Sequence, residues 1–91
     1  MFNLADKIKY YKRRFALDDD NKRGYARGFV NGASVNHTKA HNIDDRKELS
    51  LSYRELKKAK NADDRRIILA DICYLKGCLQ GYNEKMKNDK K

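Results

Sequence analysis

Residues 23–32 read Arg-Gly-Tyr-Ala-Arg-Gly-Phe-Val-Asn-Gly, and residues 76–82 read Lys-Gly-Cys-Leu-Gln-Gly-Tyr. The two segments share one pattern over seven residues: basic, Gly, any residue, aliphatic, polar, Gly, aromatic. They contain all five glycines of the chain, spaced by four residues. Residues four apart lie on one face of a helix, so each set forms a face without side chains. The pattern predicts two helices that pack closely through their glycines.

Two other interpretations of the glycines remain open. The groove they leave, flanked by Arg23, Arg27 and Lys76, could admit a phosphate backbone. Alternatively, Gly32 is a helix C-cap and Gly24 only lies near a helix N-terminus. Because a glycine inside a helix costs ~0.5–1 kcal/mol relative to alanine, their clustering favours the packing role.

Apolar spacing places helices around both glycine segments. The first helix is expected to begin after Asn3, which pairs with Asp6 as a cap, and to end near Asp18. The next runs from Asn21 to Gly32. The last begins at a cap formed by Asn61 and Asp64 and has apolar residues at alternating spacings of four and three, as in a coiled coil. These residues are Ile68, Ile72, Leu75, Leu79, Tyr82 and Met86.

Between these helices, residues 34–43 show no periodicity and are predicted to be a loop. Asp45 followed by Glu48 predicts the start of a third helix with the apolar stripe Leu49, Tyr53 and Leu56. Four helices with short connections predict an all-α fold, a small compact bundle of three to four helices. We expect one helical domain over residues 1–86 and a flexible basic tail over 87–91.

Charge indicates the kind of partner. The 91 residues include 22 Lys and Arg against 13 Asp and Glu, for a net charge of +9. Such an excess attracts polyanions, so we expect nucleic acid, DNA or RNA, to be bound mainly through phosphates. The alternative is a phage- or plasmid-type accessory or inhibitory protein that docks on an acidic surface of a larger protein. A homodimer is possible because the core is thin.

The candidate nucleic-acid-binding residues are cations on the predicted helices. Arg23 and Arg27 lie four residues apart beside aromatic residues, and Lys76 flanks the second glycine set. Lys9, Lys12 and Arg13 point away from the apolar stripe of the first helix, which consists of Leu4, Ile8, Tyr11 and Phe15. Arg54, Lys57 and Lys58 point away from the third stripe in the same manner. For each set, the alternative is an ordinary solvated helix face.

Other functions find little support. His37 and His41 have the spacing of a helical metal pair but lack the companions of a zinc motif, so they are interpreted as exposed loop residues and no metal is predicted. No cofactor motif or catalytic constellation is present, and we expect a protein that is not an enzyme. The first residues lack the apolar core of a signal peptide, and the apolar run 67–82 is too short to span a bilayer. With Cys73 and Cys78 poorly placed for a mutual disulfide, a cytoplasmic protein with no membrane partner is expected.

Overall fold

The computed structural model describes residues 3–89, and every regular element among them is helical. The α-helices are α1 (Leu4–Arg13), α2 (Asp20–Gly32), α3 (Lys39–Lys58) and α4 (Ala62–Asp89), and a 3-10 turn, Arg14–Ala16, follows α1. The predicted all-α bundle is therefore confirmed. The last helix continues through Asp89, so residues 87–89 of the predicted flexible tail are helical, and residues 90 and 91 lie outside the described residues.

Local side-chain caps fix three helix starts, two of which the sequence predicts. The side chain of Asn3 accepts a hydrogen bond from the amide of Asp6 (2.9 Å), and that of Asn61 accepts one from the amide of Asp64 (2.8 Å). The third cap was not predicted: Asp19 accepts from the amide of Lys22, and α2 begins at Asp20, one residue earlier than expected. The end of the first helix differs from the prediction, because α1 stops at Arg13 and tightens into the 3-10 turn.

The start of the third helix was predicted wrongly. Helix α3 begins six residues before Asp45, at Lys39, with Thr38 as its N-cap. The Thr38 hydroxyl accepts from the amide of His41 (3.3 Å), and Nδ1 of His41 accepts from the amide of Thr38 (3.1 Å). This reciprocal pair is a capping box in which histidine takes the place of the usual Glu or Gln.

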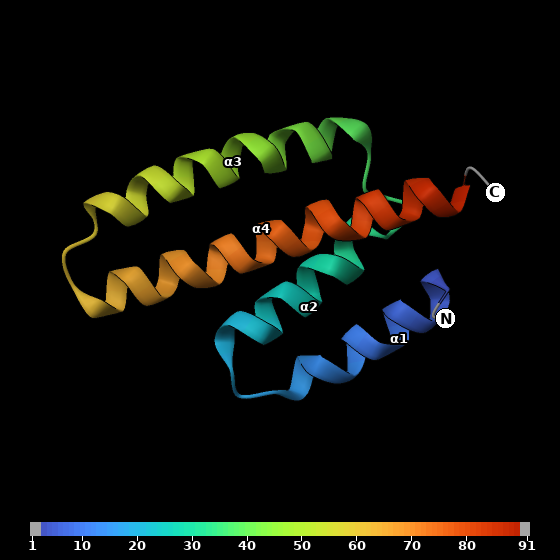
Figure 1. Ribbon diagram of the computed structural model, residues 1–91, viewed down its shortest axis with the longest axis horizontal. Coiled ribbons are helices and arrows are strands. Elements are labelled where there is room, and N and C mark those ends of the chain that lie inside the picture. Colours follow the sequence, from blue (N-terminus) through green and yellow to red (C-terminus); the bar gives the residue numbers. More distant parts are fainter. Residues whose placement is uncertain (1–2, 90–91) are drawn as a thin grey trace.

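Helices α2 and α4 form the centre of the molecule and run parallel to one another (Figure 1). A Cβ added to Gly28 would overlap the carbonyl oxygen of Tyr74, and one added to Gly32 would overlap that of Cys78. In return, Gly77 and Gly81 face backbone carbonyls of α2 in the same manner. The predicted close crossing of the two glycine helices is confirmed, and its physical basis is that only glycine lets the two backbones approach this far.

The contacts also reveal an internal repeat whose register differs from the seven-residue pattern described above. Gly28 contacts α4 at Tyr74 and Cys78, and Gly77 contacts α2 at Tyr25 and Phe29. Each α4 residue in these contacts lies 49 positions after its counterpart in α2. In this register Tyr25-Ala-Arg-Gly-Phe-Val-Asn-Gly32 aligns with Tyr74-Leu-Lys-Gly-Cys-Leu-Gln-Gly81. Eight consecutive positions then match in type: Tyr, aliphatic, basic, Gly, apolar, aliphatic, amide, Gly.

Each central helix is covered by the helix that precedes it in the chain. Helix α1 runs antiparallel to α2, and α3 runs antiparallel to α4, so that the order across the molecule is α3, α4, α2, α1 (Figure 1). The Tyr11 ring of α1 packs against Phe29 at 4.3 Å between centroids. The core is small, consisting of the buried residues Ala26, Phe29, Ala33, Ile72 and Cys78. The fold is thus two helical hairpins joined through their second helices.

Helix α3 faces α4 with a stripe that is only partly apolar. Leu49 and Leu56 point inward as predicted, whereas Tyr53 stays 40% exposed at the edge of the stripe. Asn42 and Asp45 extend the inward stripe toward the start of the helix. Over the part of the chain that is described, no helix has the length and apolar character needed to cross a membrane.

Candidate functional site

The predicted site residues of α2 lie in different surroundings. Arg23 donates a hydrogen bond to the carbonyl oxygen of Leu17 (2.8 Å) and forms an ion pair with Asp20. Its guanidinium is therefore engaged in holding the connection between α1 and α2. Arg27 is exposed, and its guanidinium lies 5.7 Å from the ring centre of Phe15.

Lys76 is the counterpart of Arg27 in the internal repeat, and its surroundings match. Its ammonium lies 5.6 Å from the ring centre of Tyr53, on the helix that covers α4. Each hairpin therefore carries one cation of its second helix over one aromatic ring, Phe15 of the 3-10 turn after α1 and Tyr53 of α3, in a favourable cation–π geometry. The two cations belong to different hairpins, so the structure does not join them into the single basic cluster that the glycine pattern suggested.

The remaining predicted residues, Lys9, Lys12 and Arg13, are all exposed on α1. None of them forms an ion pair with another residue in the range 3–89. They are free to meet an anion, and they lie outside the two hollows described below.

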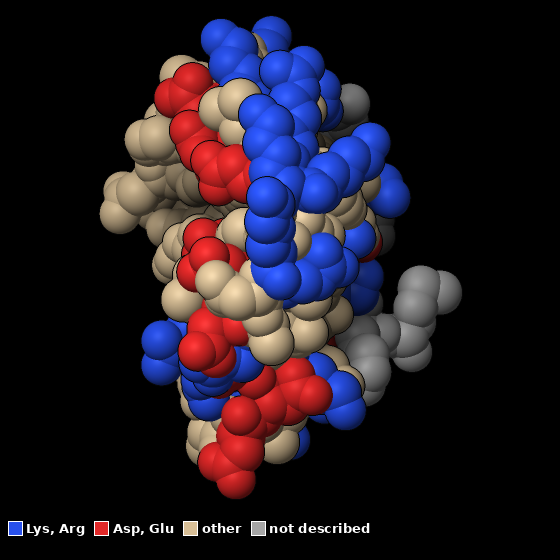
Figure 2. Space-filling view, turned by 90° about the vertical axis from the view of Figure 1, so that its left-hand side faces the viewer, with Lys and Arg blue, Asp and Glu red and all other residues tan. Residues whose placement is uncertain are grey.

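The most strongly organised charge lies on α3. At 100° per residue, six exposed cations of this helix fall within a sector of about 120°. Three exposed carboxylates, Asp44, Glu48 and Glu55, fall within about 40° on the opposite flank. The cations, which we call the basic flank of α3, are Lys39, Arg46, Lys47, Arg54, Lys57 and Lys58. Figure 2 shows the separation at the top of the molecule, where blue and red side chains occupy different sides.

A groove of about 580 Å³ lies between α3 and α4 beside this flank, with Tyr25 of α2 contributing from the central pair. We call it the Arg46–Lys76 groove. It is lined by Tyr25, Asn42, Arg46, Lys76, Leu79, Gln80, Tyr82, Asn83 and Met86. Two cations, three side-chain amides and two phenol rings thus share one concave surface, and none of the described lining residues carries a carboxylate. Burial raises the pKa of Tyr25, so its hydroxyl is protonated and able to donate a hydrogen bond at neutral pH.

A second hollow continues from the groove toward α1, since Tyr25 and Gln80 line both. Tyr10 and Tyr11 line this hollow, and the centroids of their rings are 5.1 Å apart. Its one carboxylate, Glu84, is ion-paired with Lys7 at 2.9 Å. The hydrogen bond from the Lys7 ammonium holds the pKa of Glu84 below its ordinary value.

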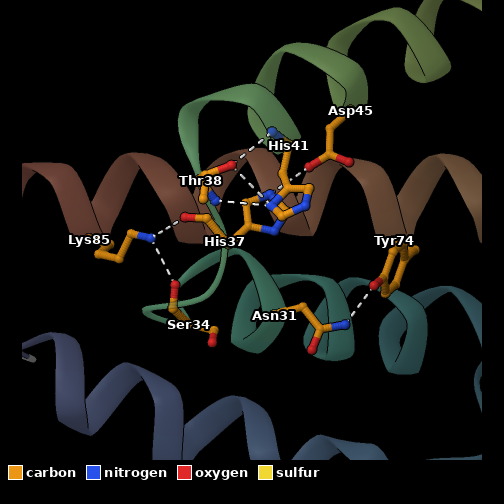
Figure 3. A network of polar contacts seen from close by, with 8 residues as sticks. All are labelled: Asn31, Ser34, His37, Thr38, His41, Asp45, Tyr74 and Lys85. Atoms are coloured by element: carbon orange, nitrogen blue, oxygen red, sulfur yellow. Dashed lines mark hydrogen bonds and ion pairs between the residues drawn. The ribbon is translucent and has the colours of Figure 1, made fainter.

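The two histidines have structural roles that the sequence interpretation missed. His37 is not an exposed loop residue: its Nε2 lies 2.8 Å from the Asp45 carboxylate, and both side chains are less than one-fifth exposed. Lys85 of α4 donates to the carbonyl oxygens of Ser34 (2.8 Å) and His37 (2.6 Å), which ties the α2–α3 connection to α4 (Figure 3). Over residues 3–89, no group of three or more His, Cys, Asp or Glu side chains is arranged to hold a metal ion.

The cysteines are free thiols with different burial. Cys78 is buried between the central helices, and desolvation raises its pKa to about 11. Cys73 is half-buried, and burial raises its pKa as well. A thiol with a raised pKa is a poor nucleophile at neutral pH, so neither is activated in this structure.

The groove residues Asn42, Arg46, Gln80 and Asn83 were not singled out from the sequence. Asn42 and Arg46 were assigned to a loop and a helix start because the third helix was predicted to begin at Asp45. A helix capped by Thr38 places Asn42 on the same inward face as Leu49, and Arg46 lies beside that face. The signal that could have revealed this was the hydrogen-bonding capacity of His41 three residues after Thr38.

No protein-family model matches the chain, and comparisons with curated proteins and with solved structures found no significant similarity.

Proposed function

We propose that the protein binds nucleic acid, mainly through contacts to phosphates. The single observation that carries this proposal is the separation of charge on α3, where six cations share one flank and the carboxylates occupy the other. A flank of this kind follows a polyanionic backbone over the length of a 20-residue helix without bringing carboxylates against it. The net charge of +9 adds long-range attraction.

The basic flank also leads directly into the Arg46–Lys76 groove, because Arg46 belongs to both. Arginine contacts phosphate through two parallel hydrogen bonds, whereas lysine acts as a point charge. We further propose a cytoplasmic location, which fits the two free thiols.

Binding to mixed-sequence DNA and RNA oligonucleotides, measured by fluorescence anisotropy over a range of salt concentrations, tests the proposal. The triple variant Arg54→Ala, Lys57→Ala, Lys58→Ala should weaken binding at least about tenfold at low salt. It should also flatten the dependence of log K on log salt by roughly 0.7–0.9 for each phosphate that is no longer neutralised. The matched control, Lys9→Ala, Lys12→Ala, Arg13→Ala, removes the same charge from α1 and should have a smaller effect.

Two outcomes would contradict the proposal in different ways. Equal weakening in both triple variants would mean that overall charge, rather than the basic flank of α3, drives association. Absence of binding to any oligonucleotide at low salt would reject nucleic acid as the partner. The acidic surface of a larger protein, as for a phage-type accessory protein, would then become the preferred partner.

A further inference from the structure

The Arg46–Lys76 groove contains a buried polar side chain, Asn42, that has no hydrogen-bond partner among residues 3–89. Asn42 is 7% exposed, and its backbone amide donates to the carbonyl oxygen of Thr38 at 3.0 Å. Its side-chain amide makes no hydrogen bond within residues 3–89, although every fully shielded polar side-chain atom there has a partner. The polar atoms of Asn42 therefore reach the groove, where they present two donors and one acceptor to whatever occupies it.

The hydrogen bonding in the groove differs from that at the equivalent residues of the internal repeat. Tyr74 of the second repeat accepts a hydrogen bond from the side chain of Asn31 of the first repeat at 2.6 Å. The equivalent residues in the groove are Tyr25 and Gln80, and no such bond joins them in the described chain. Gln80 instead donates to Glu84 at 3.1 Å, away from the Tyr25 hydroxyl. Among the described residues, the hydrogen bond that joins Asn31 to Tyr74 therefore has no equivalent between Gln80 and Tyr25 in the groove.

The lining chemistry selects among ligands. Arg46 and Lys76 suit phosphate, while the amides of Asn42 and Asn83 match the mixed donor and acceptor edge of a nucleobase. Tyr25 and Tyr82 provide aromatic surface on which a base can stack. A base inside a duplex has its paired edge and both faces covered, and a duplex is too wide to enter a groove of this volume. An unpaired nucleotide exposes its phosphate, the hydrogen-bonding edge of its base and the faces of that base.

We propose that the Arg46–Lys76 groove binds an unpaired nucleotide within a single-stranded nucleic acid. The phosphate lies between Arg46 and Lys76, and the base reaches Asn42 at the bottom. The strand continues into the adjoining hollow, where Tyr10 and Tyr11 offer the next stacking surface. This inference rests on the proposed function, because it identifies which form of nucleic acid is preferred and where it is held.

The test compares single-stranded and double-stranded oligonucleotides of one sequence by fluorescence anisotropy at fixed salt. Lys76→Ala and Asn83→Ala change exposed residues, so both variants should fold, as circular dichroism can verify. Each should weaken single-strand binding about tenfold while changing duplex binding less than about threefold. Arg54→Ala is the matched control, since it lies on the basic flank outside the groove and should weaken both forms equally. Asn42→Ala should act like Asn83→Ala.

A second readout locates the strand directly. Photocrosslinking to a single strand that contains 5-iodouridine, followed by peptide mass spectrometry, should label Tyr25 or Tyr82. Crosslinks confined to other peptides would overturn the groove proposal, as would equal weakening of single-strand and duplex binding in Lys76→Ala and Asn83→Ala. In both cases binding itself persists, so the proposed function would stand. Absence of all nucleic-acid binding by the unmodified protein would reject both proposals.

Discussion

The backbone of Gly28 lies so close to the carbonyl oxygen of Tyr74 that a methyl group on Gly28 would overlap that oxygen. The same Cβ would lie 3.0 Å from the amide nitrogen of Cys78. Both atoms belong to the backbone of α4, so no side-chain rotation can relieve the overlap. The parallel pair of α2 and α4 therefore depends on glycine at this crossing.

Replacement of Gly28 by alanine should destabilise the protein. The methyl group forces the central helices apart, and overpacking of this kind costs about 1–3 kcal/mol or more. That cost exceeds the ~1 kcal/mol that alanine gains in helix propensity. The measurement is the free energy of unfolding in urea, with Gly24→Ala as the control. A Cβ on Gly24 would meet its nearest atom, the carbonyl oxygen of Ala70, at 3.1 Å, so a smaller effect is expected. Unchanged stability in Gly28→Ala would show that the helices do not depend on this contact.

Lys85 should prove important for the order of the α2–α3 connection. Its ammonium donates to two carbonyl oxygens, and leaving them without a charged donor costs ~1–3 kcal/mol. Lys85→Met keeps the aliphatic stem and removes the charge, so it isolates these hydrogen bonds. Hydrogen exchange of the amides of residues 34–38 should become faster in this variant, with Lys87→Met, exposed on the same helix, as the control. Equal exchange in both variants would contradict the tethering role.

The elements predicted well from the sequence are those governed by neighbouring residues. Asn3 and Asn61, the two predicted caps, accept from amides three residues ahead, an interaction that needs no tertiary structure. The packing role of the glycine faces was also predictable, because the cost of clustered glycines inside helices favours it over the two other interpretations.

What the sequence left open depends on contacts between distant residues. Asp45 resembled a helix cap, but in the fold it turns inward to His37, a pairing that requires the α2–α3 connection to be in place. The two copies of the repeat are offset by 49 residues, whereas the seven-residue segments 23–29 and 76–82 are offset by 53. The offset of 49 is decided by which backbone carbonyls the glycines contact between α2 and α4. The groove joins Asn42 and Arg46 of α3 to Asn83 of α4, and the relative rotation of two helices is not encoded in either helix alone.

The Lys7–Glu84 ion pair should make stability depend on pH in the acid range. Because the pKa of Glu84 is lowered from its ordinary value of 4.5 in the folded protein, the pair contributes fully above that value. The contribution should fall as the pH drops through the lower, folded-state pKa. Both side chains are partly exposed, so its size should be about 0.2–1 kcal/mol.

Urea unfolding of the unmodified protein and of Glu84→Gln at pH 7 and pH 3 measures this difference. The variant should be less stable at pH 7 and closer to the unmodified protein at pH 3. Glu48→Gln, on the exposed acidic flank of α3, controls for the removal of one negative charge. A difference that stays constant between the two pH values would contradict ionisation of Glu84 as its source.

The two thiols should react at different rates, and this difference reports on the central helix pair. With a pKa of about 11, Cys78 is only about one part in a thousand thiolate at pH 8, and its side chain is 1% exposed. Cys73 is half-buried, so alkylation by iodoacetamide should be at least about tenfold faster there. Peptide mass spectrometry of the native protein gives both rates in one experiment, and the same measurement in urea should show them nearly equal. Rapid labelling of Cys78 in the native state would mean that α2 and α4 separate readily, which the close approach of Gly28 and Gly32 to backbone carbonyls of α4 argues against.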